Sequence, residues 1–117
     1  MARVADFTII TDSWISEFGE DTVEFEVPNT LHSGSRSVLG FMLEFLNIED
    51  ATITLRLNGE KIWNWTYSDG RRVQYFQEVI AAGVLKSGQN VFHINSTSGD
   101  ARSLRISDAV IWWQANI

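Results

Sequence analysis

Runs in which apolar and polar residues alternate one by one dominate the sequence. Between Thr22 and Val27 the apolar side chains occupy every second position, and Thr22, Glu24 and Glu26 occupy the others. Residues 51–57 repeat the same pattern. Successive side chains of a β-strand point to opposite faces, so both runs predict strands with one face buried and the other in water.

The segments around these runs indicate a hairpin and a long buried strand. Asn58-Gly59 directly follows the second run and is the pair that two-residue hairpin turns prefer, so residues 61–67 are the expected return strand. The nearly continuous apolar segment 38–48 would also fit helical spacing, but its glycine and two phenylalanines favour a central strand buried on both faces. A short helical turn is expected within residues 77–85.

Strands of this kind recur about every 8–12 residues, which is typical of sandwiches and barrels. Further strands are expected at residues 7–10, 91–95 and 103–114, the last interrupted near Ser107-Asp108. Proline occurs once, and no repeat or linker divides the chain. We therefore predict one all-β domain over residues 1–117, a two-sheet antiparallel β-sandwich whose terminal strands pair into the sheets.

Charge narrows the class of partner. The net charge is −6, and residues 1–58 hold ten acidic residues against three arginines. A nucleic-acid backbone or an anionic membrane surface would require a basic face, so neither is an expected partner. The acidic residues also have a simpler role, which is to keep the domain in solution.

Cysteine is absent, which excludes disulfides, thiolate metal sites and a cysteine nucleophile. No apolar stretch approaches the roughly 20 residues that span a bilayer. The first residues lack the apolar core of a secretory signal. A cytoplasmic location, a signal already removed and export by another route all stay open.

From Ala51 to about Trp113 the order of features resembles the galactose-binding-domain-like jelly roll. The matching segments are ATITLRLNGEKIW, YFQEVIAAGVLKSGQNVFHI and SLRISDAVIWW. In that family a Gly-x-Asn motif ends the turn before a core strand, and Gly88 with Asn90 fits it. The fold occurs in carbohydrate-binding modules and in sugar-binding domains of glycoside hydrolases, so the resemblance implies a lectin-like role. Many such modules carry a structural calcium, but this sequence has no calcium motif and we expect no cofactor.

Aromatic residues are the strongest functional signal, with five tryptophans in 117 residues. A strand places Trp63, Trp65 and Tyr67 on one face, where their rings could stack on sugar rings. The same row would equally serve as core or as a protein–protein surface. The predicted ligand-binding residues are Trp63, Trp65, Tyr67, Asp69, Arg71 and Arg72, the last three as polar contacts from the following loop.

Trp112 and Trp113 are adjacent and must point to opposite faces of a regular strand. One is expected in the core and the other at the surface, where an exposed tryptophan is a candidate interface anchor. Homo-oligomerisation through this strand is therefore an alternative role.

Signals for catalysis are weak. His32 and His93 are far apart and have no local acidic partner at metal-ligand spacing. Glu24 and Glu26 share a face, but the outer face of a strand explains them without a glycosidase mechanism. We expect no catalytic residue and no metal site. The predicted function is a non-catalytic carbohydrate-binding module, and the alternative is an assembly protein that homo-oligomerises through exposed tryptophans.

Overall fold

The structure, a computed structural model, describes residues 2–12, 15–16, 20–48, 51–67, 70–97 and 105–117. This part of the chain contains nine strands: β1 (Arg3–Thr11), β2 (Ile15–Ser16), β3 (Glu20–Val27), β4 (Ser37–Ile48), β5 (Ala51–Leu57), β6 (Glu60–Tyr67), β7 (Gly70–Ile80), β8 (Gly88–Thr97) and β9 (Arg105–Asn116). None of the described segments forms a helix that could cross a membrane.

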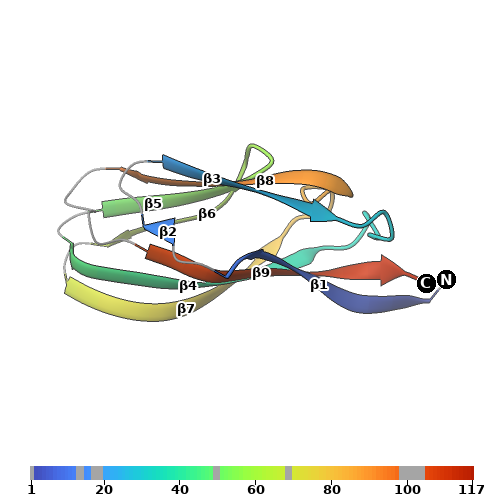
Figure 1. Cartoon of the computed structure of the whole chain (residues 1–117), viewed down its shortest axis with the longest axis horizontal. Coiled ribbons are helices and arrows are strands. Elements are labelled where there is room, and N and C mark those ends of the chain that lie inside the picture. Colours follow the sequence, from blue (N-terminus) through green and yellow to red (C-terminus); the bar gives the residue numbers. More distant parts are fainter. Residues whose placement is uncertain (1, 13–14, 17–19, 49–50, 68–69, 98–104) are drawn as a thin grey trace.

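The strands form two stacked antiparallel sheets (Figure 1). One sheet has the order β1-β9-β4-β7, with β2 also pairing with β9; we call it the β9 sheet. The other has the order β3-β8-β5-β6 and is called the β8 sheet. The predicted all-β, two-sheet sandwich is confirmed. The terminal strands pair as expected, since β1 lies along β9 from Arg3↔Asn116 to Thr11↔Ala109.

The core lies between the sheets and is built from every second residue of each strand. Leu39, Phe41 and Leu43 of β4 are completely buried, and the alternate residues of β5 face them from the other sheet. Segment 38–48 is thus a strand, as expected. Its other face is less covered than predicted, because Val38 and Met42 point outward and are only half-buried.

A buried amide network fixes the end of the sandwich where β5 turns into β6. Asn58 and Gly59 adopt φ values of 51° and 85°, as a tight hairpin turn requires. The Asn58 side chain accepts a hydrogen bond from the Val91 amide (2.8 Å) and donates to Asn90 Oδ1 (2.7 Å). Asn90 is completely buried, and Gly88 before it has φ 88°. The Gly-x-Asn motif therefore connects a turn to a core strand.

Two local predictions have different outcomes. The helical turn expected within residues 77–85 is wrong: β7 continues to Ile80, which pairs with Ser37, and a non-helical turn follows. Pairing along the whole of β4 outweighs the weak local preference for helix. The interruption expected near Ser107-Asp108 is present, since the β4–β9 register shifts there and Asp108 has φ 51°.

Candidate functional site

Trp63 and Trp65 lie on the inner face of β6, the edge strand of the β8 sheet. They pair across the ladder with Leu55 and Ile53, which are completely buried. A register shift after Leu55 leaves Ile62 as an extra residue in β6 and returns both tryptophans to the inner face. Both side chains are half-buried.

The two tryptophans belong to an aromatic cluster that joins the edges of the sheets. The Trp63 ring centroid lies 5.1 Å from that of Phe41 and 5.1 Å from that of Phe76. The Trp65 centroid lies 5.3 Å from that of Phe76. These spacings are those of favourable edge-on and tilted ring pairs. One side of each indole therefore supports the core, and the rest remains open at the edge of the sandwich.

A cavity of about 380 Å³ opens beside Trp63, and polar groups from both sheets surround it. Lys61 and Asn64 come from β6, whereas Glu78 comes from β7 and pairs with Leu39, on the inward side of that strand. Ile62 completes the described lining. An aromatic ring bordered by an ammonium group, an amide and a carboxylate is a suitable surface for a ring-shaped polar ligand.

The other predicted ligand-binding residues cannot be placed relative to this cavity. The side chains of Tyr67, Arg71 and Arg72, and the whole of Asp69, lie outside the described part of the chain. The ligand-binding role of the aromatic row stays a prediction.

The side chains of Trp112 and Trp113 point to opposite faces of β9, as the alternation along a strand predicted. Trp113 is only 3% exposed, and its Nε1 donates a hydrogen bond to Thr8 Oγ1 (3.1 Å) in the neighbouring strand. Trp112 points outward from the β9 sheet and is 36% exposed. Of the two interface candidates, only Trp112 reaches the surface.

Trp112 is part of an apolar surface that the sequence analysis missed. On the outer side of the β9 sheet, Trp112 lies between Phe7 and Val38 in register, and Val79 continues the row. We call this surface the outer apolar face; it comprises Phe7, Ile9, Val38, Met42, Val73, Tyr75, Val79, Val110 and Trp112. The sequence did indicate this face in part. Residues 73–80 carry apolar side chains at both odd and even positions, so both faces of that strand are partly apolar.

Gly40 lies at the centre of this face and lets two aromatic side chains lie close to the sheet. A Cβ atom at Gly40 would come within 1.9 Å of the Tyr75 hydroxyl oxygen and 2.8 Å of the Trp112 ring. Tyr75 therefore lies across the β4 backbone, where any larger residue would displace it. The outer side of the β8 sheet is different, since it carries Glu24 and Glu26.

The two histidines lie apart from the outer apolar face and from the cavity beside Trp63. His32 Nδ1 is 3.0 Å from Asn116 Oδ1, a contact that ties the loop before β4 to the last strand. His93 lies in β8, in register with Thr22 and Arg56. Among the described residues, no three histidine, aspartate or glutamate side chains are grouped as a metal site would need.

Several solved structures contain a domain with a similar fold. The chain is similar to part of PorU from Porphyromonas gingivalis, with a TM-score of 0.70 and 11% identity over 97% of this chain and 13% of the other. It is similar to part of an exo-β-1,3-galactanase from Phanerochaete chrysosporium (TM-score 0.51, 18% identity, 95% of this chain and 27% of the other). It is also similar to a CBM4 protein (TM-score 0.51, 11% identity, 77% of this chain and 59% of the other).

At these identities the similarities establish the fold and nothing finer. The chain has the two-sheet antiparallel β-sandwich architecture that its sequence pattern predicted. It spans about an eighth of the length of PorU. No protein-family model matches the chain, and no curated protein matches it in sequence.

Proposed function

We propose that this domain is a non-catalytic module that binds carbohydrate at the opening between β6 and β7. The observation that supports the proposal is the half-buried Trp63 ring at the edge of a cavity with Asn64, Lys61 and Glu78. The apolar face of a sugar ring would stack on the indole, and its hydroxyl groups would exchange hydrogen bonds with the three polar side chains. The proposed site continues along the chain with Trp65, Tyr67, Asp69, Arg71 and Arg72.

The absence of catalysis is part of the same proposal. Glycoside hydrolysis normally uses two carboxyl groups about 5–9.5 Å apart across the scissile bond. Of the described residues that line this cavity, Glu78 alone carries a carboxylate. One carboxylate beside an aromatic ring suits recognition of a hydroxyl pair better than acid–base chemistry.

Titration with neutral glycans, followed by tryptophan fluorescence and calorimetry, tests the proposal. Glu78→Gln and Asn64→Ala should each weaken binding about three- to tenfold, because each removes a hydrogen-bonding group at the proposed site. Glu26→Gln is the matched control, since Glu26 is exposed on the outer side of the other sheet. The proposal would be contradicted if xylans, galactans and glucans all failed to change the fluorescence or release heat. It would also be contradicted if Glu26→Gln lost as much affinity as Glu78→Gln.

A second candidate function is assembly through Trp112. The observation that favours it is the outer apolar face, to which all four long strands of the β9 sheet contribute apolar side chains. A second copy of the chain could cover this face symmetrically.

A further inference from the structure

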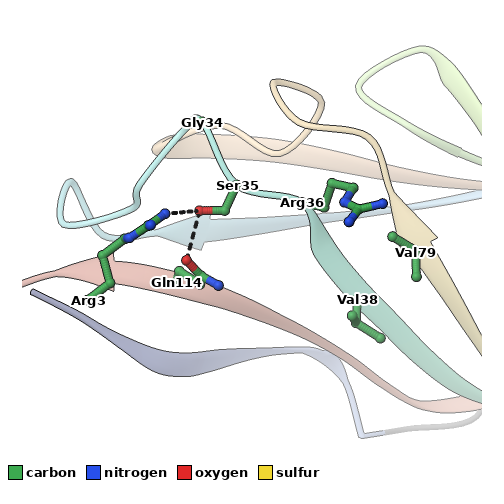
Figure 2. Close-up of a pocket in the computed structure, with 7 residues that line it drawn as sticks. All are labelled: Arg3, Gly34, Ser35, Arg36, Val38, Val79 and Gln114. Atoms are coloured by element: carbon green, nitrogen blue, oxygen red, sulfur yellow. Dashed lines mark hydrogen bonds between the residues drawn. The ribbon is translucent and has the colours of Figure 1, made fainter.

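A second cavity, of about 500 Å³, lies at one end of the outer apolar face. Figure 2 shows Arg3, Ser35 and Gln114 on one side of it and Arg36 with Val79 on the other. Val38 and Gly34 complete its described lining. The residues come from β1, β4, β7, β9 and the loop before β4, so the cavity is formed only when both edges of the β9 sheet are in place.

One wall of the cavity is a hydrogen-bonded chain of polar side chains. Arg3 Nη1 donates to Ser35 Oγ (3.4 Å), and Ser35 Oγ donates to Gln114 Oε1 (3.1 Å). This chain holds the Arg3 guanidinium group at the rim of the cavity (Figure 2). The remaining Arg3 donors and the Gln114 amide nitrogen are available to a ligand.

The charge of the cavity is opposite to that of the whole chain. The protein has 15 acidic residues and 9 basic ones, yet this cavity has two arginines and no described carboxylate in its lining. Within the described residues, the ion pair that forms is Arg105–Glu44, and neither Arg3 nor Arg36 takes part in one. Two guanidinium groups without a protein counter-charge favour an anionic ligand.

The other wall is apolar and leads to an exposed aromatic ring. Val38 pairs with Val79 on one side and with Trp112 on the other, so the cavity floor continues directly into the outer apolar face. A ligand that fits this surface has a carboxylate at one end and a flat ring with an apolar side at the other. A uronic acid residue has both features, together with hydroxyl groups for Ser35 and Gln114.

We propose that this cavity binds a uronic acid residue of an acidic polysaccharide. The carboxylate pairs with Arg36, the hydroxyl groups contact the wall formed by Arg3, Ser35 and Gln114, and the sugar ring lies over Val38 toward Trp112. This site is separate from the opening beside Trp63, and the proposal does not depend on sugar binding there.

Calorimetric titration with a galacturonate hexamer tests the proposal, in about 150 mM salt to screen long-range attraction. We expect the wild type to bind and Arg36→Ala to weaken binding about tenfold, because a charge-assisted pair is lost. Arg36→Lys, which keeps the charge but loses the planar fork, should weaken it less. Arg56→Ala removes one positive charge from the other sheet and should change little.

Three results would overturn the proposal: no binding by the wild type, an equal loss in Arg56→Ala, or equally tight binding of a glutamate hexamer, which would indicate an acidic peptide. The Glu78→Gln variant keeps the two proposed sites distinguishable. It should bind the galacturonate hexamer as the wild type does, even if neutral glycans fail to bind the domain at all.

Discussion

Asn90 shows how a single buried polar residue determines the conformation of a turn. Its Oδ1 accepts hydrogen bonds from Asn58 Nδ2 (2.7 Å) and the Lys86 amide (2.9 Å). Its Nδ2 donates to the carbonyl groups of Lys86 (2.7 Å) and Gly88 (3.1 Å). All four hydrogen-bonding capacities of the amide are used, so its complete burial leaves none of them unsatisfied.

Replacing Asn90 by Ala should lower the free energy of unfolding by about 2–4 kcal/mol, because several buried backbone and side-chain groups lose their partner together. Urea unfolding followed by fluorescence measures the change. Asn64→Ala is the control, since Asn64 is exposed and should lose no more than about 0.5 kcal/mol. Similar losses in the two variants would show that the network does not support the turn.

Gly40 is a single residue whose role could be predicted only in part from the sequence. In the sequence it weakened the case for a helix, which was correct. Its contact with Tyr75 depends on a residue 35 positions later, in a different strand. No local pattern contains such information, because only the pairing of β4 with β7 brings the two residues together.

At the scale of the strand, alternation predicted which residues share a face but not which face is buried. It placed Trp63 with Trp65 and separated Trp112 from Trp113, and both predictions are confirmed. The inward direction of Trp63 follows from the register shift after Leu55, which pairs Leu55 with Trp63 in place of Ile62, and the alternation of the sequence does not contain that shift. For the same reason the cavity beside Trp63 was only half predictable, since Glu78 reaches it from the opposite sheet.

Truncation of Trp63 should lower the free energy of unfolding more than truncation of Trp112. Trp63→Ala removes ring contacts with Phe41 and Phe76 and should cost about 2–3 kcal/mol, less than for a fully buried tryptophan. Trp112→Ala removes an outward ring and should cost about 1 kcal/mol or less. Chemical denaturation of both variants measures the difference, and equal costs would mean that Trp63 does not support the core.

At the scale of the whole molecule, the two outer surfaces of the sandwich have different chemistry. The β8 sheet presents carboxylates, whereas the β9 sheet presents Phe7, Tyr75 and Trp112. Water solvates the first surface well and the second poorly. The sequence pointed to a surface tryptophan, but the extent of the face required the register of four strands.

If the second candidate function holds, light scattering should give a mass of about twice 13.3 kDa at high protein concentration. Trp112→Ser should return the mass to that of one chain, because it removes a central aromatic group of the face. Thr66→Ala, an exposed residue on the other sheet, is the control. A wild type that stays at 13.3 kDa at every concentration would exclude self-association.

The two ends of the chain lie side by side, as Figure 1 shows, and the Ile117 amide donates a hydrogen bond to the Ala2 carbonyl (3.2 Å). A sandwich with this geometry can be spliced into a surface loop of a carrier protein, because entry and exit occur at one point and little entropy is lost in closing the host loop. It also suits circular permutation, in which a short bridge joins the present ends and new ones are opened at an exposed turn.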